Sequence, residues 1–180
     1  SNFGYQNIMY LAAGQAAAAA SGRDWDTLIQ ERIFAPLGMR ESSTSIRSLS
    51  SMPNVAQPYA QIDGAVTFVP YANIDNIGPA GSINSTVLDM AQWLRLELGD
   101  GKYGGKQIVS SANLAQTHTA QTVMKYELPW SLYFPDAHLM SYGTGWFLND
   151  YKGHIVVHHG GNIDGMSALV AMLPDEKIGA

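Results

Sequence analysis

The sequence predicts an α+β fold in which helices come first and consecutive strands come last. Between residues 3 and 117, four stretches carry strong helix formers or helical periodicity with capping residues near their ends. After Leu128-Pro129 the pattern changes to short β-rich segments that are divided by turn clusters. Because no helical stretch separates these segments, we expect an antiparallel meander and not an alternating parallel sheet.

The first two helices are expected near the N-terminus. The run FGYQNIMYLAAGQAAAAA, from Phe3 to Ala20, is rich in helix formers, with Asn2 at the N-cap position and Ser21-Gly22 as its stop signal. A second helix is expected from Asp24 to about Phe34, and Pro36 to Met39 ends it. Packing of helices against loop is therefore expected in this part of the chain.

The middle of the chain is expected to be ordered loop and then helix. Residues 40 to 80 lack sustained periodicity, apart from a short strand expected at Ala65 to Val69. Thr86 and Asp89 have the spacing of an N-cap residue and the acid at the third helical position. Two helices are expected after the loop, from Ser85 to about Leu98 and from Ser110 or Ser111 to about Thr117.

The C-terminal part is expected to hold the strands. We expect turns at Asp150 to Gly153 and at Gly160 to Gly165. The chain is then one domain, with residues 1–140 mainly helical and loop and residues 141–180 forming antiparallel strands. The expected strands run from Tyr142 to Asn149, from Ile155 to His159 and from Ser167 to Leu173.

Composition excludes several classes of function. The 180 residues carry a net charge of -5 with only 10 Lys and Arg, so no basic stripe is available for phosphates, and nucleic acid or an anionic membrane surface is a disfavoured partner. No cysteine is present, which excludes disulfides and thiolate chemistry. The apolar run from Met9 to Ala20 is interrupted and too short to span a bilayer, so it indicates a buried helix.

Three histidines stand close together in HIVVHHGGNIDG. His154 and His158 lie four apart and so on one face of a strand, whereas His159 should point to the other face. Neither Cys ligands nor a His-Glu-x-x-His pattern accompanies them, so we expect no metal site. His154 and His158 are therefore interpreted as solvated or hydrogen-bonded strand residues.

His159 differs because Gly160 and Gly161 follow it directly. Glycine removes side-chain bulk, so the backbone of a ligand could approach the strand edge and pair with it. The alternative is a tight turn that needs positive φ. The spacing alone supports both interpretations equally.

Two long phrases carry a family resemblance when they are taken together, SNFGYQNIMYLAAGQ at the start and GHIVVHHGGNIDGMSALVAMLPDEKIG near the end. They resemble the penicillin-recognising serine hydrolases, which comprise class C β-lactamases, low-molecular-weight penicillin-binding proteins and related esterases. Ser1 and Asn2 match the last two positions of that family's Tyr-Ser-Asn motif. His159-Gly160-Gly161 matches its Lys-Thr-Gly or His-x-Gly motif. Weaker matches lie between them, namely ERIFAPLGM, PAGSINSTVLDMAQWL and YGTGWFL.

The resemblance implies a β-lactamase/transpeptidase-like fold and roles for particular residues. Asn2 would contact the substrate amide and the catalytic lysine, with helix capping as its alternative role. His159 would line the pocket. Gly160 and Gly161 would keep the strand edge open, and the backbone N–H of Asn162 would form half of the oxyanion hole. No cofactor or metal is implied.

The family's nucleophile motif, Ser-x-x-Lys, has no match, because no Ser lies three residues before any Lys. No Gly-x-Ser-x-Gly motif replaces it. We therefore expect a C-terminal portion of the domain that is inactive alone, with the nucleophile region before Ser1 and the end of the domain after Ala180 missing.

Two functions stay open on this evidence. The first is part of a serine hydrolase that forms an acyl-enzyme with a β-lactam, a D-amino-acid peptide or a carboxylic ester. The second is a non-catalytic module that binds peptidoglycan-like peptides or a protein partner. The resemblance further implies a bacterial, periplasmic or extracellular protein with a small-molecule or peptide substrate. Self-association, or retention of the missing segment, is expected of the chain alone.

Overall fold

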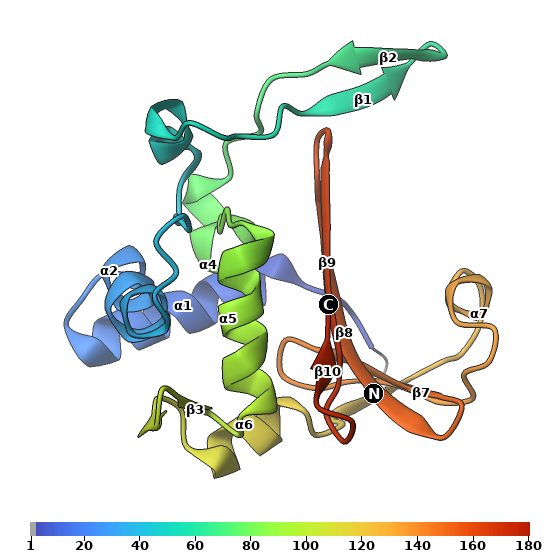
Figure 1. Ribbon diagram of the computed structural model, residues 1–180. Coiled ribbons are helices and arrows are strands. Elements are labelled where there is room, and N and C mark those ends of the chain that lie inside the picture. The colour runs from blue at the N-terminus through green and yellow to red at the C-terminus, as the bar shows by residue number, and fades with distance from the viewer. Residues whose placement is uncertain (1–2) are drawn as a thin grey trace. The chain divides into compact units, whose positions relative to one another are not determined.

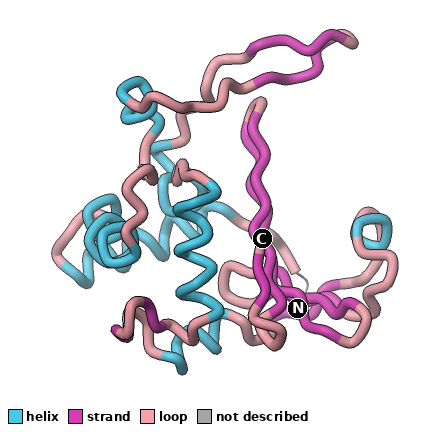
Figure 2. Tube along the Cα trace, in the orientation of Figure 1, coloured by secondary structure: helices cyan, strands magenta, loops and turns pink. Residues whose placement is uncertain are grey.

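The computed structural model describes residues 3–180, which form two compact units (Figure 1). One unit comprises the N-terminal segment up to Tyr5 together with Met90–His159 and Leu169–Ala180. We refer to it as the sheet unit. The other comprises Gln6–Asp89 and Gly160–Ala168 and is called the helical unit. Figure 2 distinguishes the helices from the strands of both units.

The first helix of the helical unit, α1, spans Asn7–Ser21. The Gln6 side chain is its N-cap and accepts from the backbone N–H of Ile8 at 3.0 Å. Gly22, with φ of 70°, ends it as predicted. The predicted start at Phe3 is wrong, because Phe3 and Tyr5 are held by aromatic contacts in the sheet unit instead of continuing the helix. Asn2, the predicted N-cap, lies outside the described residues.

The second helical stretch combines three elements. They are α2 at Trp25–Ile29, the π-helix η1 at Gln30–Phe34 and α3 at Ala35–Leu37. The helix continues past the predicted end at Phe34, because the wider π turn accommodates Pro36, which has no N–H to donate. Asp24 is the N-cap, so the helix begins one residue after the predicted start.

The segment predicted as loop holds more regular structure than expected. The short strand near Ala65 is confirmed as β2, Ala65–Phe68, but its partner β1, Tyr59–Ile62, was not predicted. The two pair antiparallel, with Tyr59 opposite Phe68. This segment also holds the 3₁₀ helices η2, Ile46–Ser51, and η3, Asp75–Ile77, and the short α4, Gly78–Gly81.

The two remaining predicted helices are confirmed. Helix α5 spans Val87–Leu98, and the hydroxyl of Thr86 accepts from the backbone N–H of Asp89 at 3.2 Å. Helix α6 spans Ser111–Thr117, with Ser110 as its N-cap. A small hairpin of β3, Lys102–Tyr103, and β4, Lys106–Gln107, lies between them in the sequence.

The main sheet has the order β10-β9-β8-β7-β6-β5, which follows the chain and confirms the predicted meander. The predicted strand from Tyr142 to Asn149 is in fact two strands, because the chain turns between Gly143 and Trp146. The short helix α7, Trp130–Tyr133, separates β5 from β6. The strands are β5, Thr122–Met124; β6, Met140–Tyr142; β7, Phe147–Tyr151; β8, His154–Ile163; β9, Met166–Leu173; and β10, Ile178–Gly179.

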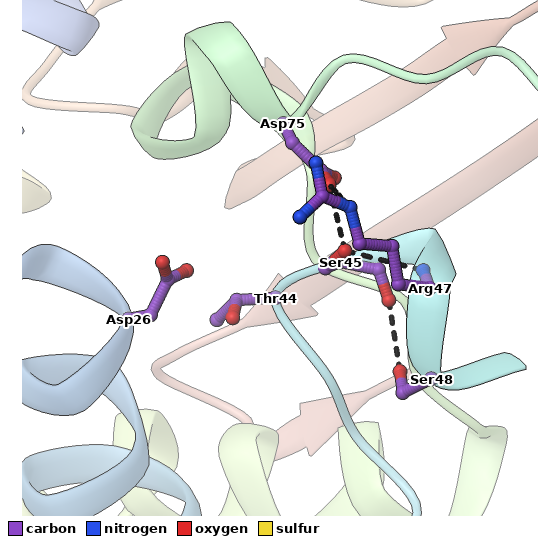
Figure 3. A pocket seen from close by; sticks show the side chains of 6 residues that line it. All are labelled: Asp26, Thr44, Ser45, Arg47, Ser48 and Asp75. Atoms are coloured by element: carbon purple, nitrogen blue, oxygen red, sulfur yellow. Dashed lines mark hydrogen bonds and ion pairs between the residues drawn. The ribbon is translucent and has the colours of Figure 1, made fainter.

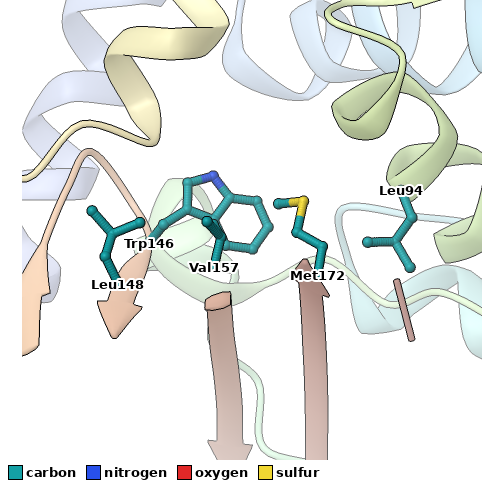
Figure 4. Close-up of a cluster of buried hydrophobic side chains, with 5 residues drawn as sticks. All are labelled: Leu94, Trp146, Leu148, Val157 and Met172. Atoms are coloured by element: carbon teal, nitrogen blue, oxygen red, sulfur yellow. The ribbon is translucent and has the colours of Figure 1, made fainter. Parts of the chain in front are cut away.

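The core of the sheet unit lies between α5 and the strands. Leu94 of α5 faces Met172 of β9 and Val157 of β8, which are almost completely buried. Trp146 and Leu148 extend the cluster, and Figure 4 shows the five side chains as one row. Burial of such side chains contributes roughly 1.5 to 3 kcal/mol each, so this row anchors the central strand that carries the histidine motif.

Candidate active site

His159 lies near the middle of β8 and faces two tyrosine hydroxyls. Its Nε2 atom is 3.2 Å from the hydroxyl of Tyr142 and 3.4 Å from that of Tyr5. Tyr142 is the last residue of β6, and Tyr5 precedes α1 in the N-terminal segment. Three segments that are distant in sequence therefore meet at one imidazole nitrogen.

An aromatic cluster surrounds this imidazole. The Phe147 ring lies 5.3 Å from that of His159 and 4.8 Å from that of Tyr142, centroid to centroid. Phe3 contacts Tyr142 at 5.3 Å, and Tyr5 stacks on Phe147 at 6.4 Å. Edge and stacked arrangements of this kind stabilise aromatic pairs by roughly 0.5 to 1.5 kcal/mol. The cluster therefore holds the N-terminal segment against β6, β7 and β8.

The glycines that follow His159 continue the strand. Gly160, Gly161 and Asn162 all belong to β8, so the interpretation of this segment as a tight turn is wrong. The turn is limited to Asp164-Gly165. Strand β7 begins at Phe147, which pairs with His158, and β8 continues from there to Ile163. The motif thus lies on extended backbone past the start of the neighbouring strand.

The other two histidines of the motif have structural partners. His158 is buried, and its Nε2 lies 2.9 Å from Oδ1 of Asn149. Burial, together with the nearby His159, lowers the pKa of His158 to about 4. His154 pairs with Glu176 at 3.0 Å. Among residues 3–180 there is no group of three or more His, Cys, Asp or Glu side chains arranged to hold a metal ion.

The alternation of strand side chains predicted that His158 and His159 point away from each other. Both rings nevertheless lie against Phe147, with centroids at 5.6 Å and 5.3 Å. His158 pairs with Phe147, the first residue of β7, so His159 has no pairing partner in β7. Because β7 does not extend past Phe147 on this side, the His159 ring has room to approach Phe147.

The sequence-based site is only partly described by the structure. Asn2 lies outside the described residues, so its approach to His159 stays a prediction. Tyr5 and Tyr142, which contact His159, were not identified from sequence. A signal for them exists, because Tyr5 follows the Ser-Asn pair closely and Tyr142 opens the phrase YGTGWFL.

A separate cavity of about 380 Å³ lies within the helical unit (Figure 3). Asp75 accepts from the hydroxyl of Ser45 at 2.7 Å and pairs with Arg47 at 3.4 Å. Arg47 is 81% exposed, so this pair is solvated and weak. The other lining residues are Asp26, Thr44 and Ser48, and none of the predicted site residues belongs to this cavity.

No helix within residues 3–180 is long and apolar enough to cross a membrane. The interpretation of the apolar run in α1 as a buried helix is wrong, because α1 packs chiefly against the short α4 and leaves its other side exposed. Of the described residues of α1, Gly14 is the one that is buried, and Ile8 and Met9 are each 63% exposed.

Comparison with known proteins identifies the family. Unguisins hydrolase ungD of Aspergillus violaceofuscus is 28% identical over 97% of this chain and 33% of its own length. The solved structure of the octameric penicillin-binding protein homologue from Pyrococcus abyssi superposes with a TM-score of 0.84 at 24% identity, over 99% of this chain and 37% of that one. The D-stereospecific amidohydrolase from Streptomyces sp. gives a TM-score of 0.75 at 22% identity, over 99% of this chain and 49% of that one.

The chain thus spans between a third and a half of the length of these proteins. From the sequence we expected a bacterial source. The similar proteins come from a fungus, an archaeon and a bacterium, so family similarity by itself does not indicate a bacterial source. The family model described as Beta-lactamase matches residues 1–180. The chain belongs to the beta-lactamase family of hydrolases, with a β-lactamase/transpeptidase-like fold.

Proposed function

We propose that the whole protein that carries these residues is a serine hydrolase. A serine hydroxyl attacks an amide or ester carbonyl, the leaving group departs with a proton, and water then hydrolyses the acyl-enzyme. The observation that supports this most is the His159-Gly160-Gly161-Asn162 run on the extended backbone of β8, with two tyrosine hydroxyls at Nε2 of His159. Family membership supports the same reaction class.

The strand β8 supplies the substrate-binding edge in this proposal. Gly161 leaves open space where a Cβ would lie, so a substrate backbone can approach without meeting a side chain. The N–H of Asn162 stabilises the developing oxyanion, and the N–H of the serine is the other donor. His159 hydrogen-bonds the substrate or a neighbouring catalytic group, and Asn2 contacts the substrate amide.

The substrate class we propose is an amide or an ester, with peptides that contain D-residues as the first candidates. The names of two similar proteins, a hydrolase and a D-stereospecific amidohydrolase, favour this class. A neutral imidazole attracts a substrate carboxylate more weakly than the lysine that many family members have at this position. That difference favours esters and peptides over carboxylate-bearing β-lactams.

The 180 residues by themselves should not form the acyl-enzyme. They contain no Ser-x-x-Lys, and loss of a serine nucleophile typically lowers kcat on the order of 10⁶-fold. We further propose a periplasmic or extracellular location, a small-molecule or peptide substrate and self-association of the chain alone. The location rests on the family resemblance only.

The test compares the whole protein with the 180-residue chain. Both are incubated with a chromogenic β-lactam, a p-nitrophenyl ester and a fluorophosphonate, and covalent adducts are measured by intact mass. We expect turnover of at least one acyl substrate and one fluorophosphonate adduct in the whole protein, and neither in the chain. Stoichiometric acylation of the chain would contradict the missing-nucleophile proposal. No adduct and no turnover in the whole protein would contradict the hydrolase and favour a binding module.

A further inference from the structure

The nitrogen Nε2 of His159 cannot satisfy both tyrosines at once. A neutral imidazole nitrogen carries either one hydrogen or one in-plane lone pair, so it makes one well-directed hydrogen bond. Tyr142 lies at 3.2 Å and Tyr5 at 3.4 Å. The two hydroxyls therefore compete for one position, and the environment of each ring decides which of them orients the imidazole.

The two tyrosines differ in how firmly they are held. Tyr142 is 8% exposed, ends β6 and packs edge-on against Phe147 at 4.8 Å, with Phe3 at 5.3 Å. Tyr5 is 48% exposed and precedes α1. A packed ring has already lost its rotamer freedom, so its hydroxyl is presented at no further entropic cost, whereas an exposed ring must be ordered first.

We propose that Tyr142 is the positioning residue for His159: its hydroxyl donates to Nε2 and holds the imidazole as the tautomer that carries its hydrogen on Nδ1. An unprotonated imidazole nitrogen is a strong acceptor and a phenol is a good donor, which sets the direction of this bond. The hydrogen bond at one ring nitrogen fixes the proton on the other. The expected effect of this bond on kcat rests on the proposed hydrolase function. The choice of tautomer does not depend on that function.

The tautomer is measured directly in the unmodified protein. Nitrogen-15 NMR of histidine-labelled whole protein at about pH 8, where an ordinary imidazole is neutral, distinguishes protonated from unprotonated ring nitrogens. Comparison with His159→Gln assigns the signals. We expect Nδ1 to carry the hydrogen, and we expect this preference to be lost in Tyr142→Phe, which removes only the hydroxyl. A hydrogen on Nε2 in the unmodified protein, or an unchanged tautomer in Tyr142→Phe, would overturn the proposal.

Two matched hydroxyl deletions accompany this variant. Tyr103→Phe removes a hydroxyl that donates to Gln92 at 2.8 Å, and it should leave the His159 signals unchanged. Tyr5→Phe should shift the tautomer less than Tyr142→Phe does. If Tyr5→Phe has the larger effect, or Tyr103→Phe has the same effect, the assignment of the role to Tyr142 is overturned.

Kinetics separate this proposal from the hydrolase function. On the best acyl substrate, Tyr142→Phe should lower kcat by about 3- to 30-fold, as expected for one hydrogen bond, with KM changed less than about twofold. An unchanged kcat would overturn the positioning role. A tautomer that depends on Tyr142 in a protein without hydrolytic activity would instead support positioning and contradict the hydrolase.

Discussion

The imidazole of His158 and the side-chain amide of Asn149 form a hydrogen bond of 2.9 Å across β8 and β7. The Asn149 amide nitrogen donates to the carbonyl of Asp150, which leaves its oxygen to accept from Nε2 of His158. His158 is 5% exposed and is therefore held neutral in the folded state. This pair makes the stability of the sheet unit dependent on pH.

Stability should fall as the pH is lowered from about 6.5 to 4. The folded pKa of His158 is about 4, below the ordinary value of 6.5, so in this window the unfolded state binds more protons than the folded state. The contribution of neutral His158 to the free energy of unfolding is fully present above pH 6.5. By pH 4 this contribution has fallen by about 2 to 3 kcal/mol. Urea unfolding of the protein and of His158→Gln at several pH values measures it. An equal pH slope in both proteins would contradict this assignment.

Gly165→Ala should destabilise the helical unit by about 1 to 3 kcal/mol. Gly165 has φ of 72°, and a Cβ there would lie 2.7 to 2.8 Å from Val69, Pro58 and the backbone of Tyr59. Gly64→Ala is the matched control, because its φ is 82° but a Cβ would meet nothing within 4 Å. Thermal unfolding should show the larger loss for Gly165→Ala. Equal losses would indicate that backbone strain alone, and not the contact, matters.

Gly161→Ala should separate folding from function. A Cβ at Gly161 meets nothing within 4 Å, and Gly161 lies in β8, so stability should change by no more than about 0.5 kcal/mol. If a substrate backbone pairs with this edge, the added methyl should still lower kcat/KM about 10-fold or more. Thermal unfolding and ester hydrolysis by the whole protein measure the two effects. Full activity in this variant would argue against close backbone approach.

The isolated 180-residue chain should self-associate. Exposed apolar side chains favour association when they leave large patches in contact with water. Analytical ultracentrifugation between about 1 and 100 μM should show dimers or larger species, and Ile8→Glu with Met9→Glu should reduce them. A monomer across this range would contradict the expectation. The exposed large apolar side chains include Ile8, Met9, Val66, Val87 and Val123.

Sequence periodicity and capping residues predicted the elements whose signals are local. Helix α5 with its Thr86 cap and α6 with Ser110 both lie where their polar caps placed them. The start of α1 was missed, because Phe3 and Tyr5 pack on aromatic side chains that are far away in the sequence. Local helix propensity does not report this long-range packing, which competes with extension of the helix.

In the candidate site, too, the local sequence features could be predicted and the tertiary contacts could not. His159 and the two glycines were proposed as site residues because the motif is contiguous in sequence. The extended conformation of Gly160 and Gly161 could not be predicted, because glycine permits both a turn and a strand. The contact between Tyr142 and His159 also depends on the turn from Gly143 to Trp146, which was predicted as continuous strand.

Substitution of His159 tests the account most directly. His159→Ala in the whole protein removes the imidazole that Tyr142 and Tyr5 face, while the backbone of β8 stays in place. We predict that kcat/KM for the best acyl substrate falls by about 10- to 1000-fold, as expected for loss of one transition-state hydrogen bond, with the melting temperature close to that of the unmodified protein. Undiminished kcat/KM in His159→Ala would contradict the role of the β8 motif in catalysis.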